Sequence, residues 1–412
     1  MAEPSGFRAH NPLRKQVRSS LYSPLIGKWG AADPLSLFQY DINFVANTYK
    51  GGFQTYGNNN NDGRFFRDPS NVTATYVPDN TGLLIAQAAA GLRRTNKGAY
   101  SYMSGTNSIL WNRDGTNAVW TKSASMTAAK TATGADGAAN SATLLTATST
   151  GATISQGFTI AAAAKVFSVD MKRVTGTGPV LMSLDGGTTT TDVSSLINST
   201  AFTQVYVASA SITNPTCWIS PTTSGDQIVM DFAQMCVPTI SGLNIPTQQR
   251  YLTTSATVIN SQSRPNVFNT DAGPLFAPTN APFGFYWQGR SERPTGGFVI
   301  TSDGNLFVNV GGSGQVVFSE NPAASTTANS VWLTGLNNVN KVAGWVTSSN
   351  IKVACNGNLG SLGSGVVFSG TQTHWDLGTN GAGANTIMGI NERVAFGPNL
   401  TFSDADLIAM TT

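Results

Sequence analysis

The stretch Val166-Phe167-Ser168-Val169-Asp170-Met171-Lys172 decides the fold class of this chain. Its residues alternate, so that Phe167, Val169 and Met171 fall on one side of an extended chain, as in a β-strand with one buried face. A strong hairpin-turn signal, Asp185-Gly186-Gly187, follows a little further on. Other short strands are expected at residues 180–184, 202–207 and 228–232. Regular short strands with Gly-rich turns predict a β-sandwich.

The composition supports the same fold class over the rest of the chain. Charged residues make up 11% of the 412 residues, against about 25% in an ordinary soluble domain. Polarity comes instead from Thr, Ser, Asn and 43 Gly, which are poor residues for helix interiors and suit short strands and tight turns. Since 40% of the residues are hydrophobic, the chain can build cores. At about 150 residues per domain, the length predicts roughly two or three domains. We expect an all-β protein.

The charge and the cysteines exclude several classes of function. A net charge of +3 is too small to indicate nucleic acid as the main partner. Cys217, Cys236 and Cys355 form neither an even disulfide framework nor a metal-ligand spacing. We expect them to be reduced and buried, since free cysteine behaves as a small hydrophobic residue.

The ends of the chain and its hydropathy bear on where it works. The start lacks the apolar core of a signal peptide. No run approaches the roughly 18 apolar residues of a membrane helix. These features fit a protein that is made in the cytoplasm, released by lysis and not inserted in a membrane.

Residues 1–62 are predicted to form an extended arm in front of the β-sandwiches. Four prolines recur there and block long regular structure. The arm is basic, and the residues expected to dock it on an acidic protein surface are Arg8, Arg14, Lys15 and Arg18. A solvated, poorly ordered terminus is the open alternative. Residues 35–49 form an amphipathic stretch that is expected to pack on a partner.

Four more segments follow the arm. Residues 63–106 are interpreted as a β-rich lead-in, 107–258 as a first sandwich, 259–280 as a Pro-containing linker and 281–412 as a second sandwich. Near the end, Ser403 is expected to cap a short helix whose first turn carries Asp404 and Asp406. The architecture predicted is therefore a tandem of antiparallel β-sandwiches.

Two stretches of the first sandwich resemble a known family. They are Thr106-Asn107-Ser108-Ile109-Leu110 with Ala118-Val119-Trp120-Thr121-Lys122-Ser123, and Phe232-Ala233-Gln234-Met235 with Tyr251-Leu252-Thr253-Thr254-Ser255. They are similar to the opening and closing phrases of a carbohydrate-binding-module-like jelly roll found in tail fibres and related attachment proteins of tailed bacteriophages. Residues 390–407 look like the last strand and terminal helical turn of a concanavalin-A-like, laminin-G-type jelly roll. The resemblance implies a virion protein that binds glycans.

The sequence offers no catalytic, metal or cofactor motif. Glycan-cleaving enzymes place two carboxylates across the scissile bond, whereas Asp303, Glu320, Asp376 and Glu392 are isolated. His374 has no nucleophile motif beside it. We therefore expect no catalytic residues, no metal site and no cofactor.

Sugar binding needs only an aromatic ring for the C–H face of a pyranose and nearby polar side chains for its hydroxyls. Candidates of this kind are Trp111, Trp287, Trp332, Trp375 and Asp376. For any one tryptophan, packing in a core is the competing explanation.

Three functions remain open at this point. The first is a phage virion protein of the fibre, spike or decoration kind, which binds host-surface polysaccharide and docks on capsid, neck or tail proteins through its arm. Such a protein is expected to be a homo-oligomer, a trimer or dimer, because repeated copies turn weak sugar affinity into avidity. The second is a purely structural capsid, neck or tail component. The third is a polysaccharide-degrading enzyme, which the missing carboxylate pattern disfavours.

Overall fold

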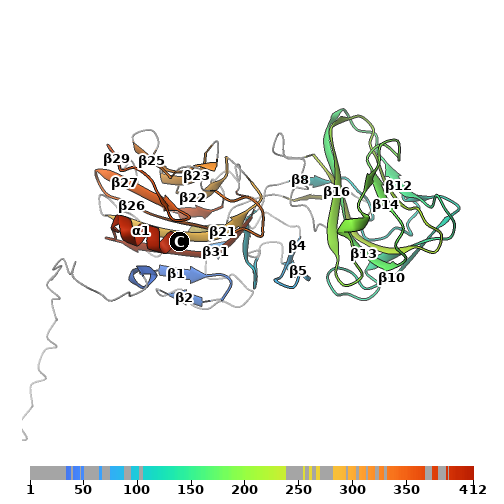
Figure 1. Ribbon diagram of the computed structural model, residues 1–412, viewed down its shortest axis with the longest axis horizontal. Helices are drawn as coiled ribbons and strands as arrows, with labels where there is room; N and C mark the ends of the chain where they lie inside the picture. Colours follow the sequence, from blue (N-terminus) through green and yellow to red (C-terminus); the bar gives the residue numbers. More distant parts are fainter. Residues whose placement is uncertain are drawn as a thin grey trace, which may run out of the picture.

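The computed structural model is almost entirely β-structure, arranged as two β-sandwiches (Figure 1). This confirms the expected all-β fold. The structure describes residues 34–38, 40–46, 48–50, 65–66, 75–87, 94–101, 105–237, 254–255, 259–261, 266–269, 282–293, 296–302, 306–311, 314–320, 324–328, 332–366, 374–378, 387 and 389–412.

The middle sandwich comprises two antiparallel sheets from residues 121–236, which we name the front sheet and the back sheet. The front sheet has the order β10 (Met126–Ala132), β11 (Ala142–Ala147), β18 (Gln227–Cys236), β13 (Ala163–Thr175), β16 (Thr203–Ile212). The back sheet has the order β15 (Thr191–Asp192), β14 (Val180–Ser183), β17 (Thr216–Pro221), β12 (Ile154–Gly157), β9 (Thr121–Lys122). A short 3-10 helix, η2 (Ser194–Leu196), precedes β16.

The core of the middle sandwich lies between these two sheets. Phe167, Val169 and Met171 of β13 are buried there, which confirms the alternation expected from the sequence. The intervening residues Ser168 and Asp170 therefore belong to the opposite, outer face of the front sheet.

The terminal sandwich also has two sheets. One contains β2 (Thr48–Lys50), β1 (Tyr40–Asn43), β31 (Gly389–Pro398), β21 (Phe283–Ser291), β26 (Asn340–Val346), β27 (Asn350–Cys355) and β28 (Asn358–Leu359), with β29 (Gly363–Ser364), β6 (Arg94–Thr95) and β7 (Gly98–Ser101) attached. The other has the order β25 (Ala324–Ala328), β24 (Val316–Glu320), β23 (Leu306–Val310), β22 (Phe298–Ser302), β30 (His374–Leu377), β20 (Asn266–Asn269), β3 (Phe65–Phe66).

The first half of strand β21, Phe283–Trp287, is buried on both faces, which explains why it contains no polar side-chain group but the Tyr286 hydroxyl and the Trp287 indole N–H. Phe285 and Trp287 point into the core between the sheets, whereas Tyr286 belongs to a separate cluster on the outside. That outer cluster is covered by α1 (Asp404–Thr411) and by the 3-10 helix η1 (Pro34–Leu37). A second apolar layer therefore closes the outer face of this sheet.

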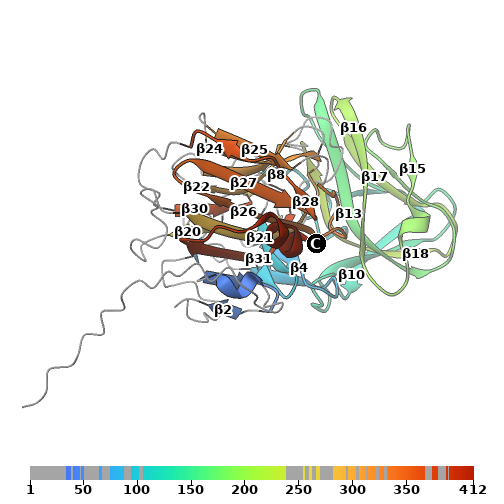
Figure 2. The same ribbon diagram turned by 60° about the vertical axis from the view of Figure 1, so that its left-hand side comes forward.

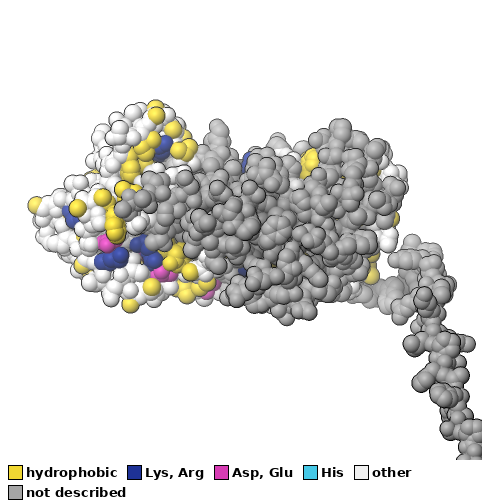
Figure 3. All heavy atoms as spheres, turned by 180° about the vertical axis from the view of Figure 1, so that it is seen from behind, with side chains coloured by type: hydrophobic (Ala, Val, Ile, Leu, Met, Phe, Trp, Pro, Cys, Tyr) yellow, Lys and Arg dark blue, Asp and Glu magenta, His cyan; other side chains and the backbone are white. Residues whose placement is uncertain are grey.

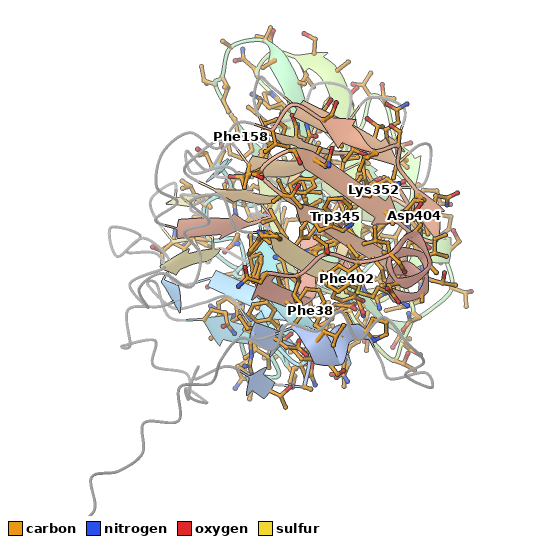
Figure 4. All side chains as sticks on the ribbon, turned by 90° about the vertical axis from the view of Figure 1, so that its left-hand side faces the viewer. Phe38, Phe158, Trp345, Lys352, Phe402 and Asp404 are labelled. Carbon is orange, nitrogen blue, oxygen red and sulfur yellow. The ribbon has the colours of Figure 1, made fainter. Side chains whose placement is uncertain are left out.

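The helix α1 begins as the sequence predicts. Ser403 is its N-cap and forms a capping box with Asp406, whose carboxylate accepts from the Ser403 backbone N–H. The Asp404 carboxylate pairs with Lys352 of β27 at 3.1 Å. On the other side of the helix, the rings of Phe38 and Phe402 are 5.3 Å apart (Figure 4). These contacts fix the C-terminal segment on the sheet.

The middle sandwich is inserted into the terminal sandwich. Strands β1, β2, β6 and β7 precede it in sequence, yet they belong to the same sheet as β21 and β31. Residues 34–50 thus form part of a folded domain, so the expected arm over 1–62 is too long. The reason is a long-range pairing, in which Tyr40–Asn43 runs antiparallel to Phe396–Arg393.

The expected lead-in and linker also differ from the structure. Strands β6 and β7 of the lead-in pair within the terminal sandwich, and β3 pairs with β20, which lies inside the expected linker 259–280. At the connection itself, β8 (Gly105–Asn107) pairs with β19 (Ile259–Ser261). This two-stranded stalk brings the chain into the middle sandwich and out of it (Figure 1).

A hairpin of β4 (Thr75–Pro78) and β5 (Leu84–Gln87) lies between the sandwiches (Figure 1). Its Val77 packs with Tyr100 and Ile390 of the terminal sandwich. Its Leu84, with Tyr76 at the edge, packs with Phe232 of the middle sandwich. One face of the hairpin therefore contacts the terminal sandwich, and its other face contacts the middle sandwich.

Three further observations bear on the expectations from sequence. All three cysteines are free and buried. Among the described residues, no helix has the length and hydropathy needed to cross a membrane. On the visible face of the middle sandwich, charged side chains are few and hydrophobic side chains gather in a band (Figure 3).

Candidate functional site

The outer face of the front sheet carries an unusual set of polar side chains. Ser168 of β13 lies opposite Tyr206 of β16 on one side and Gln234 of β18 on the other. One row along, Asp170 lies opposite Gln204. We name these five residues the polar face.

The polar face runs from solvent into the protein. Tyr206 is 42% exposed and Gln204 is half-buried, whereas Ser168 and Asp170 are buried and Gln234 is 0% exposed. A ring at the surface thus borders amide and hydroxyl groups that lie deeper.

Two glutamine amides of the polar face are unsatisfied. Both amide atoms of Gln234, Nε2 and Oε1, are buried and have no hydrogen-bond partner among the described residues. The same holds for Nε2 of Gln204 within that part of the chain. A buried polar group without a partner costs about 1–3 kcal/mol. Native proteins keep few such groups, and each one points to an ordered water, a ligand or a functional role.

A buried ionic network borders the polar face. Arg113 donates from Nε to Asp231 Oδ1 at 2.7 Å and from Nη2 to Asp231 Oδ2 at 3.0 Å. It also binds Asp136 with two hydrogen bonds of 2.8 Å. Backbone N–H groups of Ala135 and Phe232 donate to the same Asp231 carboxylate. This network holds the loop at residues 134–138 against β18.

Asp231 lies opposite Asp170 across β13 and β18, so the two acids could be read as a catalytic pair. The contacts of Asp231 argue against that reading. Both of its oxygens are bound by Arg113 and backbone N–H groups, and the residue has no exposed surface. Burial raises the pKa of Asp231, but hydrogen bonds from Arg113 and two backbone N–H groups occupy both of its oxygens, so the carboxylate has a structural role.

A bulge in β18 explains why Phe232 also faces outward. Ser168 pairs with Gln234 and Asp170 with Asp231, so two residues of β18 lie opposite Val169 alone. Phe232 takes up the extra length with φ of 43°, an uncommon angle for a residue with a Cβ. Its ring lies beneath the Arg113 guanidinium, with Cζ 4.1 Å from the ring centroid. The bulge thus places the ionic network and the aromatic contact side by side.

Two of the predicted sugar-binding tryptophans prove to be core residues. Trp287 is 0% exposed and Trp332 is 8% exposed, and their rings stack with centroids 5.8 Å apart. The Trp287 Nε1–H donates to Asn391 Oδ1, and the Trp332 Nε1–H donates to the Arg293 carbonyl. Their polar neighbours therefore satisfy the indole N–H groups, and the buried rings offer no free face to a sugar.

The other predicted residues stand differently. Trp111 is half-buried with φ of 49°, and its carbonyl accepts a hydrogen bond from the Trp120 indole. Trp375 and Asp376 belong to β30, and their side chains lie outside the described residues. The docking residues Arg8, Arg14, Lys15 and Arg18 also lie outside them. Of the tryptophans whose side chains are described, Trp111 belongs to the middle sandwich and Trp287 and Trp332 to the terminal one, so these three do not form one site.

The residues of the polar face were not predicted as a site, although the sequence carries a trace of them. Gln234 interrupts the apolar run of β18, and Gln204 and Tyr206 alternate with buried valines in β16. Within the described ranges, no group of three or more His, Cys, Asp or Glu side chains could hold a metal ion.

Comparison with known proteins gives a limited result. No family model and no curated protein sequence matches this chain. The carbohydrate-binding module CBM40 of Ruminococcus gnavus IT-sialidase, solved with α2,3-sialyllactose, is similar in structure at a TM-score of 0.27 and 15% identity, over 32% of this chain and 84% of that one.

Two other solved structures are similar at the same level. The leech intramolecular trans-sialidase gives a TM-score of 0.29 and 15% identity, over 36% of this chain and 26% of that one. The tandem CBM22 domain of Paenibacillus barcinonensis Xyn10C gives 0.23 and 9%, over 73% and 99%. Scores this low assign the chain to none of these families and say nothing of its ligand.

Proposed function

We propose that this chain is a non-catalytic glycan-binding protein and that the polar face of its middle sandwich holds the sugar. We propose further that it is a virion component of a tailed bacteriophage, of the fibre, spike or decoration kind, which binds polysaccharide on the host surface. Its N-terminal basic residues would dock it on capsid, neck or tail proteins.

The observation that carries the proposal is a set of three buried amide atoms, two of Gln234 and one of Gln204, that have no partner among the described residues and lie beside an exposed tyrosine. A primary amide presents a donor and an acceptor side by side. Two neighbouring hydroxyls of a pyranose match that arrangement, one accepting from Gln234 Nε2 and the other donating to Gln234 Oε1. The ring of Tyr206 supplies an apolar surface for the C–H groups of the same or the next sugar.

Entry of the sugar proceeds from Tyr206 and Gln204 toward Gln234. Because Gln234 is fully covered in this structure, the deepest contact requires a local opening when sugar binds. The gain in hydrogen bonds for three unsatisfied amide atoms favours that opening.

The virion role rests on the sequence resemblance to phage attachment proteins and on the display of two sandwiches by one chain. The competing role is a structural one at the capsid, neck or tail, without a receptor. Both roles fit a protein whose β-sandwiches bind other molecules through their outer faces. Only the first requires the polar face to bind sugar.

A glycan array of bacterial surface polysaccharides, probed with the full chain, tests sugar binding. We expect at least one bound glycan, and we expect Tyr206→Ala to lower the affinity for it at least tenfold in calorimetry. Leu196→Ala is the control, because Leu196 is 56% exposed on the same sandwich and belongs to η2, outside the three strands of the polar face. An array without any bound glycan would favour the structural role.

The docking proposal needs a separate experiment. Residues 34–50 include strands of the terminal sandwich, so deletions should end before them. We expect a chain with Arg8→Glu, Arg14→Glu, Lys15→Glu and Arg18→Glu to fold and yet to be absent from purified particles. Normal incorporation of this variant would contradict the docking role.

A further inference from the structure

Strand β16 is a long and uncharged sheet edge, regular in its pairing with β13 from Thr203 to Ser209 and interrupted by a register shift only between Ser209 and Ile212. It spans ten residues, Thr203–Ile212, and pairs with β13 on one side only among the described strands. An edge strand presents a row of unpaired N–H and C=O groups, which natural proteins shield with charges, prolines, bulges or short length. The sequence of β16 contains no charged residue and no proline.

The other outer strands of the two sandwiches are shorter than β16, and the longest of them carries a charge. At the opposite edge of the front sheet (Figure 2), β10 carries Lys130 and a register shift after Ala129. Strands β9, β15, β3 and β28 have two residues each, and β2 has three. The five-residue β25 is covered by the segment at Ser361, whose carbonyl accepts from Thr326. Against these, β16 stands out by its length and neutrality.

The surroundings of β16 in sequence are neutral as well. Between Asp192 and Asp226 the chain has no Asp, Glu, Lys or Arg. Two copies of this edge can therefore approach without repulsion between like charges. A partner that used charge for recognition would find none here, whereas a second identical edge matches it in length and polarity.

We infer that β16 pairs antiparallel with β16 of a second copy of this chain across a two-fold axis. The two front sheets then form one continuous sheet. A two-fold axis perpendicular to the sheet places the same face of both copies on the same side. Even-numbered residues of one β16 therefore lie opposite even-numbered residues of the other. Tyr206 then lies near the small side chain of Ala208 of the partner strand, within the regular part of β16, and this alanine leaves room for its ring.

This pairing goes beyond the proposed function and does not depend on it. If the polar face binds sugar, the dimer presents two such faces on the same side of one sheet. Two linked sites raise the avidity for a repeating polysaccharide. The pairing itself is measured without any glycan.

Analytical ultracentrifugation of the full chain tests the inference. We expect a dimer at micromolar concentration and a dissociation constant at least tenfold higher for the double variant Ala208→Lys, Ala210→Lys. These exposed alanines leave the core untouched, and the lysines of two copies would meet at the junction. Ala129→Lys is the matched control, since Ala129 is an exposed alanine on the opposite edge, and it should leave the dimer intact.

A crosslink identifies the strand directly. We expect Ala208→Cys to yield a covalent dimer with a short bismaleimide, and Ala129→Cys to yield none. A monomer, a trimer or a dimer that is insensitive to the lysines at 208 and 210 would overturn the inference. So would a crosslink from the Ala129→Cys variant alone.

Discussion

The ring of Tyr76 packs edge-on against the ring of Phe232, with centroids 5.1 Å apart. Tyr76 belongs to the hairpin between the sandwiches and Phe232 to the bulge of β18, directly beside the polar face. The next residue, Val77, packs into the terminal sandwich. One strand thus sets the position of the middle sandwich relative to the domain that surrounds it in sequence.

Replacing Tyr76 by alanine should loosen this connection. Half-burial of the ring predicts a loss of stability on the order of 2 kcal/mol, less than for a fully buried aromatic residue. We expect a lower urea midpoint and faster proteolysis between the sandwiches. Ile85→Ala, at an exposed position of the same hairpin, should change neither. Equal proteolysis of both variants would contradict a positioning role for the hairpin.

The ionic network should respond strongly to loss of its cation. Arg113→Met leaves the Asp231 carboxylate buried without its partner, which costs about 3–5 kcal/mol. Lys130→Met breaks a pair in which the lysine side chain is 39% exposed, and such pairs are worth less than about 1 kcal/mol. Urea unfolding compares the two variants. Similar losses of unfolding free energy for both variants would show that the Arg113 network stabilises the fold no more than a surface ion pair does.

The same network predicts a dependence of stability on pH. Burial acts to raise the pKa of Asp136, but hydrogen bonds from Arg113 and the Ala138 N–H outweigh it, so the pKa lies below the ordinary 3.8. The folded state then binds the proton less tightly than the unfolded chain. This stabilisation is present above about pH 4 and is lost as pH falls through the folded-state pKa.

Unfolding of the wild type and of Asp136→Asn across pH 2–7 measures that contribution. We expect the wild type to lose more stability than the variant below pH 4, so that the two curves converge at low pH. Parallel curves over the whole range would contradict the lowered pKa of Asp136.

The tryptophan pair of the terminal sandwich should matter for stability and not for sugar binding. Trp332→Phe removes the Nε1–H that donates to the Arg293 carbonyl, which still accepts from the Ser291 hydroxyl, and the loss of one such hydrogen bond costs about 0.5–1.5 kcal/mol. We expect a lower melting temperature and an unchanged affinity for any glycan bound by the wild type. A loss of glycan affinity in a variant that is fully folded would show that Trp332 contributes to binding.

Local sequence signals predicted the local structure well. The alternation around Phe167 and the capping signal at Ser403 depend on neighbours a few residues away, and both appear in the structure. The pairing of Tyr40–Asn43 with β31 depends on residues 350 or more positions away. No periodicity in residues 35–49 could reveal that partner strand. The predicted N-terminal arm was therefore too long.

The candidate site shows the same limit. The sequence cannot distinguish a tryptophan that binds sugar from one that packs in a core beside polar residues. Trp287 is of the second kind, because its indole N–H donates to the buried Asn391. Gln234 within the apolar β18 was the better signal. Gln234 becomes recognisable as part of a site only when the pairing of β13, β16 and β18 places Ser168 and Tyr206 beside it.

Gln234→Leu is the most direct test of the claim that the polar face exists to bind sugar. The substitution removes two unsatisfied buried atoms and keeps a similar volume. Calorimetry for the glycan and urea unfolding of the free protein should therefore move in opposite directions, with affinity falling at least tenfold while stability stays equal or rises by about 1 kcal/mol. Unchanged affinity, or a clear loss of stability, would contradict the proposed role of Gln234.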